Sequence, residues 1–276
     1  MSIKLVVTDL DGTLLTSDKK VSPRAMRAIE AMRERGVHFT IATGRNTASA
    51  AGIIRQLRIQ APVIVGNGAF VHDPDGKKFY HKELMPEKDI RTVMDVTREM
   101  DTSFYAFDEE LIYCPRTRAT EESVRWFAIA KNPILQKSFR WFDTYEQVME
   151  AVSGRTAKLL IIEGDLEKNA RVRAEVERRV KVMIVNSEPE KLDISNYGVS
   201  KGRAIRQVAE ILGLKKEEVL ALGDGENDAE MMENAGIGVA MKNAVDAVKD
   251  AADFVTLDND ADGFAYAIER FVLHEE

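Results

Sequence analysis

Short apolar runs alternate with amphipathic stretches in the first third of this chain, and the same alternation returns near its end. Parallel strands need a long crossover between them, and a helix usually provides it. The alternation therefore predicts an α/β fold in which helices cover a parallel sheet. In the N-terminal part the strand-like runs are residues 3–9, 37–43 and 61–73, the last running into a turn, and the helix-like stretches are residues 22–36 and 45–57.

The middle of the chain has a different texture. From about Pro86 to Lys191 the segments are more polar, and strand-like runs appear in pairs as well as singly. A strand followed by an acidic loop returns at residues 217–228. We therefore expect one α/β sheet domain built from both ends of the chain, residues 1–84 plus 193–276, with an α+β domain of residues 85–192 inserted between them.

Composition excludes several classes of function. Lys and Arg number 39 and Asp and Glu 46, so the formal charge is 39 − 46 = −7, which argues against a nucleic-acid-binding surface but allows a small phosphorylated ligand beside a bound cation. The single cysteine, Cys114, excludes an internal disulfide and a cysteine-rich zinc site. No stretch reaches membrane-spanning length and the first residues lack a signal-like pattern, so we expect no membrane partner and a cytoplasmic protein.

Two carboxylates follow the first strand-like run one residue apart, in VVTDLDGTLL. Side chains alternate along an extended strand, so Asp9 and Asp11 point the same way. Gly12 allows the chain to turn directly after them. In open parallel sheets ligands bind beyond the carboxyl ends of strands, which is where this pair falls.

Other polar groups occupy comparable places, at strand ends or helix starts. They are Thr43 and Gly44 in ATGR, Lys201 in VSKG, and Asp224, Asn227 and Asp228 in GDGEND. An amide at a helix start favours an anion, and a lysine there is unfavourable unless an anionic partner offsets the helix dipole. This oxygen-rich set has no histidine or thiol ligand, which suits Mg²⁺. Taken singly, each motif also has a structural explanation, such as a turn or a cap, and it is their order that favours a site.

That ordered set, DLDGTL, ATGR, VSKG and GDGEND, resembles the haloacid dehalogenase superfamily of phosphotransferases. The motifs span residues 9 to 228, and the segment between ATGR and VSKG resembles the type IIB cap of the Cof-like phosphatases. The resemblance implies a Rossmann-like parallel-sheet core with an inserted cap of the C2B type. It also implies a Mg²⁺-dependent phosphatase that hydrolyses small phosphorylated metabolites, such as sugar phosphates or phosphorylated cofactors, through an aspartyl-phosphate.

The resemblance also implies a role for each motif residue. Asp9 would be the nucleophile, and Asp11 the general acid that then acts as a base. Mg²⁺ would be held by the Asp9 carboxylate, the Asp11 main-chain carbonyl and Asp224, with Asp228 supporting the site directly or through water. The phosphoryl oxygens would be held by the Leu10 and Gly44 amides, Thr43, Lys201 and Asn227.

Two other functions remain open at this stage: a phosphomutase of the phosphomannomutase-like type, and a ligand-binding relative without turnover. The inserted domain would serve as a lid with hinges near residues 84–86 and 192–198. Arg45 and Asn67 are further candidates for substrate contacts, although Asn67 could equally form a turn. We expect a monomer or a homodimer.

Overall fold

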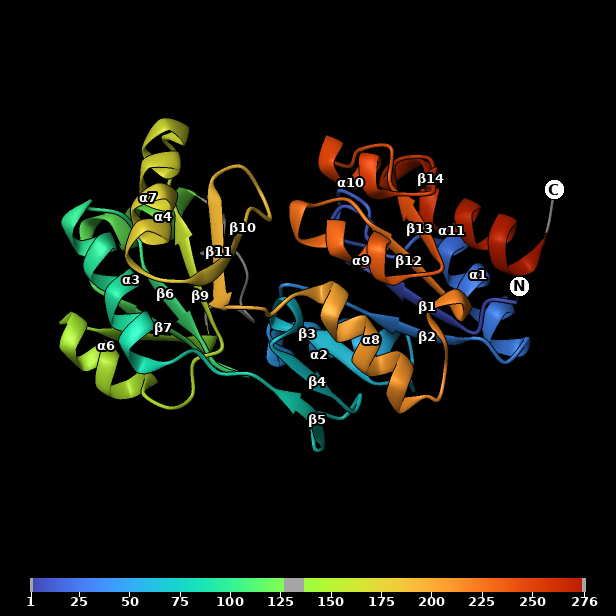
Figure 1. Cartoon of the computed structure of the whole chain (residues 1–276), viewed down its shortest axis with the longest axis horizontal. Helices are drawn as coiled ribbons and strands as arrows, with labels where there is room; N and C mark the ends of the chain where they lie inside the picture. The colour runs from blue at the N-terminus through green and yellow to red at the C-terminus, as the bar shows by residue number, and fades with distance from the viewer. Residues whose placement is uncertain (1, 127–136, 275–276) are drawn as a thin grey trace. The chain divides into compact units, whose positions relative to one another are not determined.

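The computed structural model describes residues 2–126 and 137–274 and divides into two compact units (Figure 1). The core unit comprises Met1–Gly44, Ala51–His81 and Ser200–Glu276. The inserted unit comprises Lys82–Val199 together with the short segment Arg45–Ala50. Each unit has its own sheet and is described separately.

A five-stranded parallel sheet forms the centre of the core unit, in the order β14-β13-β12-β1-β2. Its strands are β1 (Leu5–Thr8), β2 (His38–Ile41), β12 (Val219–Gly223), β13 (Ile237–Ala240) and β14 (Phe254–Val255). Every residue of β1 and β12 is buried, as expected for a sheet covered on both faces. Thr8 lies opposite both Ile41 and Leu222, so the chain leaves β1, β2 and β12 at the same edge of the sheet.

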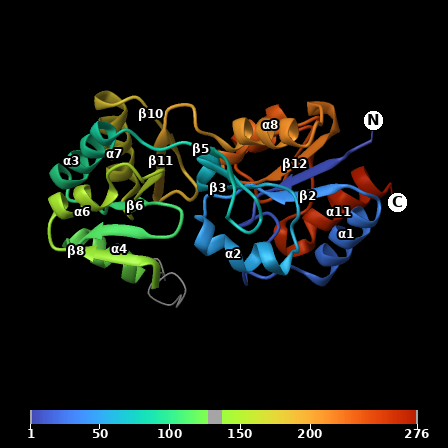
Figure 2. The ribbon, with the colours of Figure 1, turned by 90° about the horizontal axis from the view of Figure 1, so that it is seen from below.

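Helices cover both faces of this sheet (Figure 2). They are α1 (Pro23–Glu34), α2 (Thr47–Gln56), α8 (Lys201–Ile211), α9 (Ala229–Asn234), α10 (Asp246–Ala251) and α11 (Gly263–Ile268). On one face, α8 packs Ile205 and Val208 against Leu5 and Val7 of β1. Figure 2 shows α1 and α11 on the opposite side of β1 from α8. The predicted α/β class with a parallel sheet is confirmed.

The apolar run at residues 61–73 is not the single strand that its sequence indicates. It forms a hairpin of β3 (Val63–Val65) and β4 (Phe70–His72), joined by the 3₁₀ turn Gly66–Gly68. Together with β5 (Phe79–Lys82) the hairpin makes a three-stranded sheet. The chain reverses because all three turn residues have positive φ, 60° at Gly66, 58° at Asn67 and 100° at Gly68.

The inserted unit is built on a six-stranded sheet in the order β10-β11-β9-β6-β7-β8. Its strands are β6 (Tyr105–Phe107), β7 (Ile112–Pro115), β8 (Phe139–Phe142), β9 (Lys158–Ile162), β10 (Val182–Val185) and β11 (Lys191–Asn196), and its helices are α3 (Glu87–Glu99), α4 (Arg118–Trp126), α6 (Tyr145–Val152) and α7 (Leu166–Arg179). All strand pairs are antiparallel except β7 with β8. Helices α3, α6 and α7 pack on one apolar face of the sheet, around Phe104 and Leu159. This unit therefore has the predicted α+β character.

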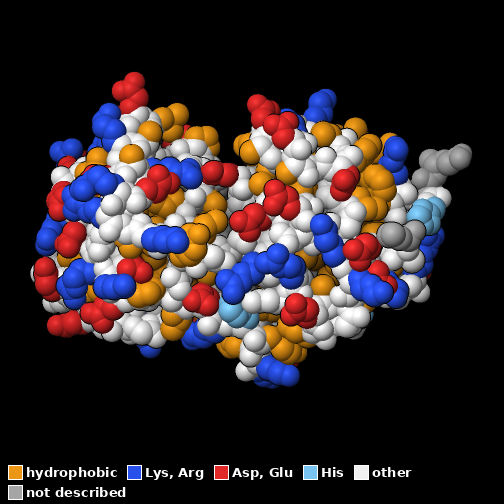
Figure 3. Space-filling view, viewed as in Figure 1, with side chains coloured by type: hydrophobic (Ala, Val, Ile, Leu, Met, Phe, Trp, Pro, Cys, Tyr) orange, Lys and Arg blue, Asp and Glu red, His pale blue; other side chains and the backbone are white. Residues whose placement is uncertain are grey.

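Charged side chains are mixed over the surface: acidic and basic groups are intermingled on the visible face of each unit (Figure 3). Among the described residues, no helix has both the length and the apolar character needed to cross a membrane.

Two helical glycines should respond in opposite ways to the same substitution. A Cβ at Gly202 of α8 would lie 2.4 Å from the Glu230 carbonyl oxygen of α9, whereas a Cβ at Gly52 of α2 would meet nothing within 4 Å. We expect Gly202→Ala to lower the free energy of unfolding by roughly 2 kcal/mol, because overpacking outweighs the gain in helix propensity. Gly52→Ala should raise it by about 0.5–1 kcal/mol. Urea unfolding of both variants tests this, and equal effects would contradict the close α8–α9 packing.

Candidate active site

The predicted site lies at the edge of the core sheet where β1 and β12 end. The Asp9 amide donates to the Leu222 carbonyl (2.9 Å), so the strand ladder continues to the first motif residue. Asp224 follows β12 directly. Asp9 and Asp224 thus follow adjacent strands that are far apart in the sequence. Motifs at strand ends predict that such residues lie close together at one edge of the sheet.

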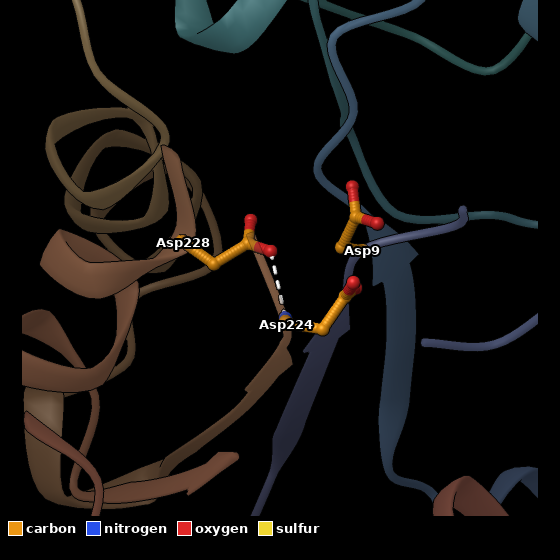
Figure 4. Close-up of side chains that lie close together, drawn as sticks. All are labelled: Asp9, Asp224 and Asp228. Carbon is orange, nitrogen blue, oxygen red and sulfur yellow. Dashed lines mark hydrogen bonds between the residues drawn. The ribbon is translucent and has the colours of Figure 1, made fainter. Parts of the chain in front are cut away.

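Three carboxylates gather at this edge. Oxygens of Asp9, Asp224 and Asp228 all lie within 4.8 Å of one another, and Figure 4 shows their side chains converging. Asp9 and Asp228 are buried, with 6% and 1% of their surface exposed. Such a cluster is unfavourable unless cations or hydrogen bonds compensate it.

Lys201 supplies part of that compensation from the first residue of α8. Its Nζ donates to Asp9 Oδ1 (2.7 Å) and to Asp228 Oδ1 (2.6 Å), and its side chain is 1% exposed. Burial alone would lower the pKa of Lys201, but the charges of Asp228 and Asp9 outweigh burial and raise it. Lys201 is therefore a permanent cation in this site.

Asp228 is engaged at both of its oxygens. Oδ1 accepts from Lys201, and Oδ2 accepts from the backbone amides of Asp224 (2.9 Å) and Gly225 (3.0 Å). Figure 4 shows the bond to the Asp224 amide. Asp228 thus fixes both the lysine and the loop that presents Asp224.

The loop after β1 closes on Asp224. The Thr13 hydroxyl donates to Asp224 Oδ1 (2.5 Å). A Cβ at Gly12 would lie 2.3 Å from Asp224 Oδ2, and the φ of Gly12 is +91°, so both space and backbone conformation require glycine here. Sequence reasoning missed Thr13, although its place within DLDGTL is a signal.

The charges at this edge do not balance. Burial, followed by repulsion from Asp228, raises the pKa of Asp224 to about 7. Burial also raises the pKa of Asp9, with Lys201 opposing it and Asp228 and Asp224 adding to it. Three carboxylates share one buried ammonium, so the site has an excess of negative charge. Buried carboxylate oxygens with uncompensated charge fit a hard divalent cation.

Asp11 lies outside this buried cluster. Its side chain is 37% exposed, and its carboxylate forms an ion pair with Lys19 Nζ (2.9 Å). Its charge nevertheless contributes to the raised pKa of Asp224. The structure thus places Asp11 near Asp224 but at the solvent side, where a carboxyl group can exchange a proton.

The remaining predicted residues meet around Asn67. Thr43 is 2% exposed, its amide donates to the Ile64 carbonyl (3.0 Å), and its carbonyl accepts from the Asn67 amide (3.0 Å). Asn227 Nδ2 donates to Asn67 Oδ1 (2.9 Å). A Cβ at Gly44 would lie 2.9 Å from the same Oδ1. Asn67 therefore forms a turn and also contacts Gly44 and Asn227, whereas the sequence did not decide between a turn and a substrate contact.

The Leu10 side chain is fully buried, so only its backbone can serve a ligand. Among the described residues, no oxygen accepts a hydrogen bond from the Leu10 amide. Arg45, the other candidate for substrate contacts, begins the segment Arg45–Ala50 that groups with the inserted unit.

Two asparagines that no motif marks hold the loop after β1. Asn243 Nδ2 donates to the Gly12 carbonyl (2.8 Å), and Asn259 Nδ2 donates to the Leu15 carbonyl (3.0 Å). The Asn259 amide in turn donates to Asn243 Oδ1 (3.1 Å). These bonds hold the backbone of the loop at Gly12 and Leu15, directly after Asp11.

Comparisons with known proteins agree with this geometry. A family model described as haloacid dehalogenase-like hydrolase matches residues 6–268. A 5-amino-6-(5-phospho-D-ribitylamino)uracil phosphatase of Bacillus subtilis is 29% identical over 99% of this chain and 97% of its own length. A pyridoxal phosphate phosphatase of Escherichia coli is 29% identical over 99% of this chain and 100% of its own. A solved haloacid dehalogenase-like hydrolase from B. subtilis is 30% identical, with a TM-score of 0.85 over 98% of this chain and 100% of the other.

The pKa of Asp224 predicts how a divalent cation should stabilise the protein. Because this pKa is raised to about 7 in the fold, folding binds a proton between the unfolded pKa and about 7, and the metal-free fold loses stability as pH rises through that range. A bound cation replaces the proton, so its stabilising effect should grow over the same range. We expect Mg²⁺ to raise the melting temperature more at about pH 8 than at about pH 5.5.

Melting curves in EDTA and in Mg²⁺ at both pH values measure this effect. Asp224→Asn is the matched variant: it should melt higher than the wild type in EDTA at the upper pH and gain little from Mg²⁺. An equal gain from Mg²⁺ at both pH values would contradict the expectation that Asp224 is one of its ligands.

Proposed function

Since this chain belongs to the haloacid dehalogenase-like hydrolase family and is an enzyme that hydrolyses phosphoric monoesters of small compounds, we propose a magnesium-dependent mechanism for it. In this mechanism Asp9 is the nucleophile. The observation that supports this most is the buried Lys201 ammonium bonded to Asp9 within a cluster of three carboxylates. A nucleophilic carboxylate needs cations around it to approach an anionic phosphate.

The Asp9 carboxylate is oriented for attack by Lys201. Lys201 bonds Oδ1, which leaves Oδ2 to form the new bond to phosphorus. As that bond forms, the bond from phosphorus to the ester oxygen breaks, and the leaving oxygen takes the electron pair. Asp9 then holds the phosphoryl group as an acyl phosphate.

Asp11 is suited to move the proton in both halves of the reaction. It stands two residues from Asp9 and is partly exposed beside Lys19. We assign it protonation of the leaving oxygen in the first half. In the second half it accepts a proton from the water that attacks phosphorus, which frees Asp9 and inorganic phosphate.

Asp9, Asp224 and the main-chain carbonyl of Asp11 would hold the metal. Mg²⁺ bound there supplies the positive charge that lets a phosphate approach the carboxylates. Asp228 has both oxygens engaged by Lys201 and by two amides. We therefore assign Asp228 the role of holding Lys201 and the Asp224 loop, with any contact to the metal made through water.

The phosphoryl oxygens would be held by groups from three loops. The Leu10 amide lies in the first, the Thr43 hydroxyl and Gly44 amide in the second, and the Asn227 amide in the third, with Lys201 between them. Backbone amides and one fixed ammonium suit a phosphate that spreads charge over several oxygens. Residues 85–192 would act as the cap that selects the organic part of the substrate.

For the substrate we propose small phosphorylated metabolites, either sugar phosphates or phosphorylated cofactors. The support comes from two relatives, which are phosphatases of 5-amino-6-(5-phospho-D-ribitylamino)uracil and of pyridoxal phosphate. A phosphomutase would share the attack by Asp9 but return the phosphoryl group to its substrate. Release of inorganic phosphate separates these two outcomes.

The proposed roles predict distinct losses. With p-nitrophenyl phosphate and Mg²⁺, Asp9→Asn should lose more than about a thousandfold in kcat, because an amide cannot take the phosphoryl group. Asp11→Asn should lose about 10²–10⁴-fold. Asp75→Asn, an exposed carboxylate of the core unit with 77% of its side chain in solvent, is the matched control and should keep wild-type activity. An active Asp9→Asn variant, or activity undiminished by EDTA, would refute the mechanism.

A further inference from the structure

The turn Gly66–Gly68 contacts three of the four segments that bring a group to the phosphate, namely the end of β2, the loop after β12 and the start of α8. All three of its residues are buried, and Asn67 has the left-handed φ of 58°. Glycine meets such a conformation at lower cost than any other residue. Because glycine would suit this backbone better, the presence of a buried asparagine indicates that its side chain has a role.

The first contact is with the end of β2. The Asn67 amide donates to the Thr43 carbonyl (3.0 Å). The Asn67 side chain lies against the Cα of Gly44, since a Cβ there would be 2.9 Å from Asn67 Oδ1. Asn67 thus fixes the backbone that presents both of these residues.

The second contact is with the loop after β12. Asn227 Nδ2 donates to Asn67 Oδ1 (2.9 Å), across 160 residues of sequence. This bond sets the direction of the Asn227 side chain. The third contact is with the start of α8: a Cβ at Gly68 would lie 2.3 Å from the Ser200 carbonyl oxygen, directly before Lys201.

We propose that Asn67 is a positioning residue for the phosphoryl group, acting through Asn227 and Gly44. This inference rests on the proposed function, because it assigns those two residues to the phosphate. Oδ1 of Asn67 holds the Asn227 amide in one orientation, and its side chain keeps the Gly44 backbone in place. Without it, Asn227 would have to be ordered by the substrate itself, at a cost in binding and rate.

Asn67→Gly separates this role from a purely structural one. Glycine accepts the left-handed backbone, so the turn and the fold are kept, while the bond to Asn227 is lost. We expect kcat/KM for p-nitrophenyl phosphate to fall about tenfold or more, with weaker inhibition by inorganic phosphate, and no loss in melting temperature. Arg58→Gly, at an exposed residue with φ of 50°, is the matched control and should leave both kinetic constants unchanged.

A double-mutant cycle with Asn227→Ala tests the coupling. Because Asn67 acts partly through Asn227, the loss in the double variant should be smaller than the product of the two single losses. Wild-type kinetics in Asn67→Gly, or losses that multiply in the double variant, would overturn the inference while leaving the phosphatase mechanism intact. Calorimetric titration of inorganic phosphate into the Mg²⁺-loaded proteins gives a second readout. If the wild type hydrolyses no ester, the proposed function fails, and unequal phosphate affinities of the wild type and Asn67→Gly would still support the role of Asn67.

Discussion

The site depends on one buried ammonium held between two buried carboxylates. Lys201 joins the end of β1, through Asp9, to the turn after β12, through Asp228, and these partners are 192 and 27 residues away in sequence. Removing one partner of a buried pair costs roughly 3–5 kcal/mol, because it leaves an uncompensated charge. The start of α8, the end of β1 and the turn Glu226–Asp228 must therefore keep their relative positions for the core unit to be stable.

Stability alone does not explain the composition of this cluster. One carboxylate would suffice to neutralise Lys201, yet two pair with it, and Asp224 lies within 4.8 Å of both. Burial raises the pKa of Asp224 to about 7, which shows that its ionised form is unfavourable in the metal-free fold. A cationic ligand that binds the ionised carboxylate would offset this unfavourable free energy at Asp224. Ionisable groups with strongly shifted pKa values are concentrated at functional sites.

Sequence reasoning could predict the parts of the site that follow local rules. Strand-end motifs meet at one edge of a parallel sheet, so Asp9 and Asp224 could be placed together, and the order of the motifs added Lys201 at a helix start. The hairpin at residues 61–73 was harder to predict from the sequence. Its turn is buried and is flanked on both sides by apolar runs, so the whole segment looks like one strand. Positive φ at Gly66, Asn67 and Gly68 reverses the chain, and the sequence GNG indicated a turn without showing that it lies inside the run.

Other parts of the site have no local signal. Asn243 and Asn259 bond backbone carbonyls 231 and 244 residues away, and neither belongs to a motif. The role of Asp228 likewise depends on which way its carboxylate faces. An aspartate four residues after Asp224 could ligate a metal or support the loop, and our assignment of Asp228 to support rests on its bonds to Lys201 and two amides.

The division of the chain explains why its sequence identifies a reaction more readily than a substrate. Every residue that we assign to the nucleophile, the metal or the phosphate belongs to the core unit. Phosphoryl transfer makes the same demands whatever the ester, so these residues can stay fixed while other parts of the chain vary. The inserted unit has its own sheet and its own apolar core around Phe104 and Leu159, so its surface residues can change without disturbing the chemistry of the core. The residues that we assign to the reaction accordingly lie in one unit, and the information on the organic part of the substrate must come from residues outside that set.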